Sequence, residues 1–366
     1  MAASGCESSS GAPGRFGAAG APAVTSAAVR LELTEDEETV REVFAGFFAQ
    51  ESSIEVVRAS EPVGFDLGLW TKLAQTGAPG MAVSEAAGGG GATLADLAVV
   101  ATEAGRRLAP VPLVEHAVAT RLVAAAAPAD SSLGSLIAGD QVGILALAPA
   151  VDGVARLVPG GSAANVVVGL DGDDLVIVAG EPPAGPANTG HAALADRDLR
   201  AEGRRVIGGA SHYARARAEW QALTASALVG LGHQALDIGV EYVMQRQQFD
   251  VPVGSFQAVQ HGLATASVDM EGAEYLAHKA VWALASGHAD ADNMASMAFL
   301  FAAESAQAAA AASLQYHGGY GYSDEYDIQL YFRRAKSMTL VHGDPGLEIR
   351  SLADRLLGPV GTGASA

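Results

Sequence analysis

Hydrophobic residues first recur at helical spacing between residues 31 and 137. Thr34 followed by Glu37 has the spacing of a capping box, in which two side chains satisfy backbone amides at a helix start. Apolar residues then return on one helical face: Val40, Val43, Phe44, Phe47 and Phe48. Segments 66–74 and 93–108 predict further helices. This part of the chain is therefore expected to form an N-terminal helical domain.

The period of the pattern changes between residues 138 and 206. Segments 142–147 and 165–168 are short apolar runs of the kind found in buried strands. The segment 170–178 predicts a hairpin that turns at or near Asp171-Gly172. We therefore expect a small β-sheet domain in the middle of the chain.

From residue 207 to residue 366 the pattern is helical again. The expected helices are 217–246, 256–287, 292–315 and 326–340, with a last one from 344 to 358. In the last helix Asp344 is a good N-cap and Pro345 suits the first turn. Long helices with short connections predict an up-down four-helix bundle. The expected fold class is thus mostly α, with a helical N-terminal domain, a small β-domain and a C-terminal bundle.

Composition and charge narrow the classes of ligand and of site. Asp and Glu number 41 against 22 Lys and Arg, a formal net charge of −19, which opposes non-specific nucleic-acid binding. A phosphate-bearing ligand must then be held by local basic side chains and backbone amides. The single cysteine is Cys6, so no internal disulfide and no cysteine metal cluster can form, and no metal site is expected.

Two segments of the sequence indicate where in the cell the protein is expected. Residues 1–30 are rich in Ala, Gly and Ser and lack the pattern of a secretory signal, so we expect a disordered head. The most apolar long run, 294–314, is broken by Glu304 and Gln307, which favours a buried bundle helix over a membrane span. A cytoplasmic protein without a membrane segment is expected.

Two motifs carry the candidate chemistry. Met244-Gln-Arg-Gln-Gln-Phe-Asp250 follows one long helix, and Gln315-Tyr-His-Gly-Gly-Tyr-Gly-Tyr322 follows another. The forked guanidinium of Arg246 suits a pyrophosphate, and glycines let backbone amides approach a ligand closely. Taken singly, both have simpler interpretations, because an arginine or a glycine is common where a helix ends.

Together, with Phe256-Gln257 after the first, these motifs resemble those of the acyl-CoA dehydrogenase family, a group of flavoproteins. The resemblance is most specific over about 150 C-terminal residues, and it implies that these segments hold the adenosine-diphosphate half of FAD across a subunit interface. The implied cofactor contacts are Arg246, Phe249, Gln257, Gln315, Gly318 and Gly319. The chain departs from the family at Asp250, where a glycine is usual and where a carboxylate would repel the pyrophosphate unless it turns away or pairs with Arg246.

The family's catalytic base is the second departure. The family removes a proton α to a thioester, and one location of its base is His342 here, while the other is Trp220. Glu219 is adjacent to Trp220 but points about 100° away on a helix, and the family's nearby arginine is Gln221. The β-domain also lacks the family's flavin-facing motifs, since no tryptophan lies between Trp70 and Trp220.

These departures lead to one hypothesis and two alternatives. The chain resembles a supporting subunit of a heteromeric acyl-CoA dehydrogenase, with no catalytic residue of its own, a paralogous catalytic partner, an acyl-CoA held mainly by that partner, and a bulky or steroid-derived acid as one substrate class. Electron-transfer flavoprotein is the family's common electron acceptor, and a heterotetramer is expected. The first alternative is a self-sufficient dehydrogenase that uses His342 or Asp344 as its base, although Asp344 is more simply an N-cap. The second is a structural homologue without cofactor.

Overall fold

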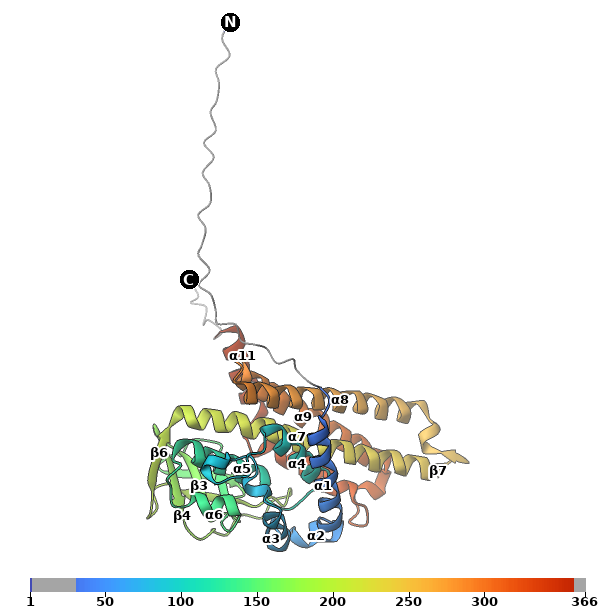
Figure 1. The fold of residues 1–366 in the computed structure, drawn as a ribbon. Coiled ribbons are helices and arrows are strands. Elements are labelled where there is room, and N and C mark those ends of the chain that lie inside the picture. Colours follow the sequence, from blue (N-terminus) through green and yellow to red (C-terminus); the bar gives the residue numbers. More distant parts are fainter. Residues whose placement is uncertain (2–30, 359–366) are drawn as a thin grey trace.

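The computed structural model describes Met1 and residues 31–358 and confirms the expected fold class (Figure 1). The expected disordered head, residues 1–30, lies outside the described residues except for Met1. The boundaries drawn between the three parts remain predictions. The order of the elements follows the expected sequence of helices, strands and helices.

The N-terminal part is helical. Its helices are α1 (Glu35–Glu51), α2 (Ile54–Ser60), α3 (Leu67–Gln75), α4 (Leu94–Arg106), α5 (Leu113–Ala126) and α6 (Leu133–Ala138), with short 3-10 turns η1 (Ala78–Gly80) and η2 (Glu85–Ala87). The expected capping box of Thr34 and Glu37 is present at α1. Thr93 forms a second one with Asp96 at α4. Asp66 caps α3 by accepting a hydrogen bond from the Leu69 amide at 2.7 Å.

The middle part contains a four-stranded sheet and a two-stranded one. The strands are β1 (Gly143–Leu145), β2 (Val154–Pro159), β3 (Val166–Asp171), β4 (Asp174–Ala179), β5 (Leu194–Asp198) and β6 (Arg205–Gly209). The larger sheet has the order β1-β3-β4-β6, and β2 pairs with β5. Only the β1–β3 pair is parallel in it. The expected hairpin joins β3 to β4 and turns after Asp171 at Gly172, whose φ is 64°.

The C-terminal part is built on one very long helix. Its elements are α7 (Ala210–Gln245), β7 (Gln247–Gln248), β8 (Val251–Pro252), η3 (Val253–Ser255), α8 (Gln257–Ser286), α9 (Ala291–Tyr316), η4 (Gly318–Tyr322), α10 (Ile328–Leu340) and α11 (Pro345–Leu357). The expected start of the first helix at 217 was wrong, because α7 begins at Ala210, directly after β6. Tyr213 and Ala216 are buried, so packing extends the helix into the β-domain.

Helix α7 lies at the centre of the molecule and contacts α4, α5, α8, α9 and α10 (Figure 1). Glycines permit its close crossing with α4. A Cβ at Gly230 would stand 1.9 Å from the Thr102 carbonyl oxygen, and one at Gly105 would stand 1.9 Å from that of Ala227. One helix of the described residues, α9, is long and apolar enough to cross a membrane by composition alone. It packs against α7 and α8, as a core helix of a bundle does.

Candidate functional site

The end of α7 carries the first group of residues implied to contact the cofactor. Arg246 caps the helix C-terminus, and its guanidinium lies 5.9 Å from the centre of the Tyr320 ring. The side chain is exposed and has no ion-pair partner among the described residues. A cation at this position is available to an anion from outside the chain.

A two-residue turn follows Arg246. Phe249 and Asp250 join β7 to β8 with φ values of 55° and 63°, in the left-handed region that glycine adopts most easily. The glycine that the resemblance leads us to expect at position 250 would adopt this conformation without strain. Asp250 is exposed and forms no ion pair with Arg246 in the structure. Phe249 is 88% exposed and lies edge to face with Phe256, with ring centres 6.3 Å apart.

The second group lies where α9 ends. Gln315, Gly318 and Gly319 are exposed, and a Cβ built on either glycine would meet no atom within 4 Å. The two groups are held together by His317, which stacks on Tyr242 of α7 with ring centres 3.9 Å apart. Gln257, the first residue of α8, is also exposed at this end. The structure thus places all the implied cofactor contacts on exposed surface, and their role in binding FAD remains a prediction.

A cleft of about 720 Å³ lies between the β-domain and α10. Its size is typical of a site for a small molecule or cofactor. Basic and apolar groups line it, including Arg156 of β2, Arg333 and Lys336 of α10, and His342 at the end of α10. No aspartate or glutamate of the described residues lines this cleft. Arg156 pairs with Asp196 and Arg333 with Glu61, which leaves Lys336 as the cation of the cleft without an ion pair among the described residues, and the cleft offers no carboxylate as a base.

His342 lines that cleft but is already engaged. Its Nε2 lies 2.9 Å from Arg217 Nη2 and 3.3 Å from Gln221 Nε2, and because both are donors, Nε2 accepts. The ring stacks on Trp220, with centres 5.5 Å apart. Burial first, and the Arg217 charge second, lower the pKa of His342 to about 4. The imidazole is therefore neutral at pH 7, and the nitrogen that would take a proton is occupied.

Asp344, the other candidate for a catalytic base, acts as a helix cap. Its carboxylate accepts a hydrogen bond from the Gly346 amide at 2.9 Å, as the N-cap interpretation predicted. Glu219 is likewise engaged, because Arg121 Nε lies 2.9 Å from its Oε2 and Arg215 Nε lies 3.3 Å from its Oε1. Neither carboxylate lines the cleft.

Sequence reasoning missed a buried polar network beneath His342. Glu348 of α11 accepts from Ser296 of α9 at 2.8 Å and lies 3.7 Å from Arg217 and 3.4 Å from Arg355. Burial acts to raise the pKa of Glu348, but hydrogen bonds from Ser296 and Gln221 outweigh it and lower the pKa. The partners are far apart in the sequence, so only the fold brings them together.

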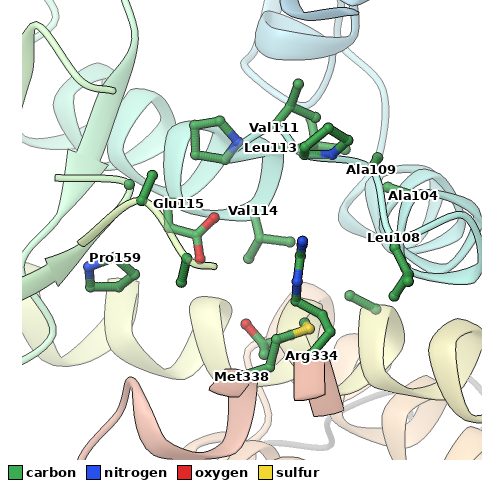
Figure 2. Close-up of a pocket in the computed structure, with 18 of the residues that line it drawn as sticks. Ala104, Leu108, Ala109, Val111, Leu113, Val114, Glu115, Pro159, Arg334 and Met338 are labelled. Carbon is green, nitrogen blue, oxygen red and sulfur yellow. The ribbon is translucent and has the colours of Figure 1, made fainter. Parts of the chain in front are cut away.

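A second pocket was also missed. It has a volume of about 130 Å³ and lies among α4, α5, α7 and α10. Figure 2 shows Glu115 and Arg334 reaching into it from different elements, among apolar side chains such as Val114 and Met338. Pro159, Ser337 and Val341 line both this pocket and the cleft, so the two spaces adjoin. Glu115 and Arg334 each lie in a segment with a helical pattern. Such a pattern does not indicate that two residues distant in the sequence face the same pocket.

Comparisons with known proteins place this arrangement in a family. The description "Acyl-CoA dehydrogenase, N-terminal domain" matches residues 34–129, and "Acyl-CoA dehydrogenase, C-terminal domain" matches residues 203–357. The chain therefore belongs to the acyl-CoA dehydrogenase family, an oxidoreductase family whose cofactor is FAD.

Two relatives match this chain over nearly the whole of their own length. The chain is 31% identical over 87% of its length to "Acyl-CoA dehydrogenase IpdE2" of Mycolicibacterium smegmatis, covering 98% of that protein. It is 33% identical, again over 87% of its length, to the protein of the same name in Mycobacterium tuberculosis, covering 96% of that protein.

Solved structures also superpose on this chain over most of its length. The "Tcur3481-Tcur3483 steroid ACAD G363A variant" superposes with a TM-score of 0.80 at 26% identity, over 88% of this chain and 98% of that one. The "ChsE4-ChsE5 complex from Mycobacterium tuberculosis" gives 0.81 at 23% identity, over 90% of this chain and 100% of that one, which shows the shared fold.

Proposed function

We propose that this chain is a supporting subunit of a heteromeric FAD-dependent acyl-CoA dehydrogenase. It lends Arg246, Phe249, Gln257, Gln315, Gly318 and Gly319 to an FAD shared with a paralogous catalytic subunit, which holds most of the acyl-CoA. The observation that carries the proposal is the lining of the cleft. No carboxylate of the described residues lines the cleft, and the Nε2 atom of His342 is occupied by Arg217 and Gln221.

The donors at the hairpin end fit the adenosine-diphosphate half of FAD. The Arg246 guanidinium has no acidic partner among the described residues and can bind two phosphate oxygens. The turn at Gly318 and Gly319 exposes its backbone to approach from outside. Phe249 offers an exposed apolar face beside them. These groups are exposed on the surface of their own chain, which suits a cofactor bound at a contact between subunits.

In this proposal the steps of the reaction are divided between this chain and the partner subunit. When bound, FAD accepts the hydride that leaves the β-carbon of the thioester. This chain's residues bind and orient, while the α-proton must go to a base on the partner. The relatives support a heteromer and a bulky substrate, since one solved neighbour is named as a steroid enzyme with two components and another as a complex of two proteins. A steroid-derived acyl-CoA and electron-transfer flavoprotein as acceptor belong to the same proposal.

Expression alone and together with a paralogous acyl-CoA dehydrogenase subunit from the same genome tests the proposal. We expect stoichiometric flavin, and a mass near four chains on sedimentation, only after co-expression. A chain that purifies alone with flavin and oxidises acyl-CoA would make it a self-sufficient dehydrogenase. Absence of flavin in both preparations would make it a structural homologue.

A further inference from the structure

The small pocket beside the cleft contains a cation that forms no direct ion pair with the described residues. Arg334 projects into it from α10 (Figure 2), and no hydrogen bond or ion pair of its guanidinium is found within the described residues. Burial lowers the pKa of Arg334, although the side chain as a whole is only half-buried. A charge that has lost part of its hydration gains from an anion or from acceptors that meet it. Its neighbour Arg333 pairs with Glu61 at 2.5 Å.

Two further polar groups converge on the same space. The hydroxyl of Thr224, on α7, lines the pocket and is buried, with no hydrogen-bond partner among the described residues. Glu115, on α5, accepts from Trp220 Nε1 at 3.3 Å but stands more than 4.0 Å from Arg334, beyond ion-pair distance. Burial raises the pKa of Glu115. Arg334 and Thr224 thus present donors from two elements, and no acceptor within the described residues takes them.

A negatively charged group rich in acceptors would meet both donors. A carboxylate has two oxygens and about four acceptor positions, and it pairs with an arginine fork in a bidentate manner. The volume of about 130 Å³ is roughly ten times the minimum for one water, so a carboxylate with a short carbon chain fits. The remaining walls, from Leu108, Val114 and Met338, are apolar and suit that chain.

We propose that this pocket is a carboxylate-binding site, in which Arg334 and Thr224 bind the two oxygens and Glu115 faces them. The ligand is either a free short-chain carboxylic acid or the far carboxylate of a dicarboxylic acyl thioester whose other end lies in the adjoining cleft. The site is a property of this chain and does not rest on its role as a supporting subunit.

Calorimetry on the full chain, in the assembly in which it purifies, tests the site with matched probes. Pentanoate against 1-pentanol tests a free acid, and glutaryl-CoA against pentanoyl-CoA tests a thioester with a distal acid. We expect the carboxylate member of at least one pair to bind at least tenfold more tightly. A preference in the first pair identifies a free acid as ligand, and a preference only in the second identifies a thioester. No preference in either pair overturns the proposal.

Variants then assign the preference to the pocket. Arg334→Met should abolish it, whereas the same substitution at the exposed Arg350 of α11 should leave it unchanged. Thr224→Val, which removes only an unpaired hydroxyl, should weaken carboxylate binding several-fold and keeps the test open if Arg334→Met does not fold. Glu115→Gln should retain the preference, because the glutamine amide can donate to the ligand and carries no charge that opposes it. A preference that survives both Arg334→Met and Thr224→Val would place the carboxylate elsewhere and refute the site.

Discussion

At the hairpin end of the bundle, Arg246, Gln257 and Gln315 are exposed and form no side-chain hydrogen bond within the described residues. At the junction of α10 and α11, His342 and Glu348 are surrounded by donors from their own chain. The two regions lie on one helix, since Gln221 and Gln245 both belong to α7, roughly 36 Å apart at about 1.5 Å per residue.

The difference separates residues that serve the chain from residues available to another molecule. At the junction, each acceptor is paired internally, so the network stabilises the position of α11. At the hairpin, Phe249 and Asp250 occupy left-handed backbone conformations, and a phenylalanine is exposed to solvent. Such features cost stability and gain nothing within the chain. We therefore expect substitutions at the junction to change folding, and substitutions at the hairpin to change cofactor binding alone.

The largest expected effect tests the junction. Glu348→Ala removes the buried acceptor of Ser296 and the acid beside Arg217 and Arg355, so two positive charges lose their carboxylate. We expect a loss of about 3 kcal/mol in the free energy of unfolding, measured by urea titration. Asp354→Ala, at an exposed position on the same helix, is the control and should change it by less than about 0.5 kcal/mol. Equal losses in the two variants would show that the network contributes little.

The next effect tests the hairpin. Arg246→Ala removes a charge-assisted contact worth about 1.5–3 kcal/mol, so flavin retention in the assembled complex should fall by about one to two orders of magnitude. Stability should not change, because the side chain is exposed and unpaired within the described residues. Arg350→Ala is the matched control. Unchanged flavin retention would leave Arg246 as an ordinary arginine at a helix end.

The sequence predicted these two regions unequally, for a physical reason. Helix caps such as Thr34, Asp66 and Asp344 accept hydrogen bonds from amides two or three residues away. A short stretch of sequence is therefore enough to indicate them. The motifs that contain Arg246 and Gly318 are also recognised from residues next to one another in the sequence. The pairs Glu348–Ser296 and Arg217–His342 join residues 52 and 125 positions apart, and Glu115 faces Arg334 only through the packing of α5 on the bundle. No local pattern specifies such pairs.

A smaller effect concerns pH. The pKa of His342 is lowered from 6.5 to about 4 in the folded chain, so the unfolded chain binds more protons between those values. The stability that comes from the neutral imidazole is therefore fully present above about pH 6.5 and is lost as the pH falls toward 4. The lowered pKa of Glu348 adds a loss of the same sign at still lower pH. Urea titrations of the parent and of His342→Gln should show a shallower decline between pH 6.5 and 4 in the variant. Parallel curves would assign the decline to other groups.

The smallest expected effect is on turnover. If His342 only packs on Trp220 and accepts from Arg217, His342→Ala should leave the turnover of the assembled complex within a few-fold of the parent. A general base would behave differently, because its loss costs about 10²–10⁴-fold. An assay with an artificial electron acceptor separates these outcomes, provided that flavin content and assembly are measured on the same samples. His342→Gln, which keeps an acceptor for Arg217, serves as the control for packing. A collapse in the rates of both variants with flavin and assembly intact would make His342 the base, and the junction would then belong to the active site.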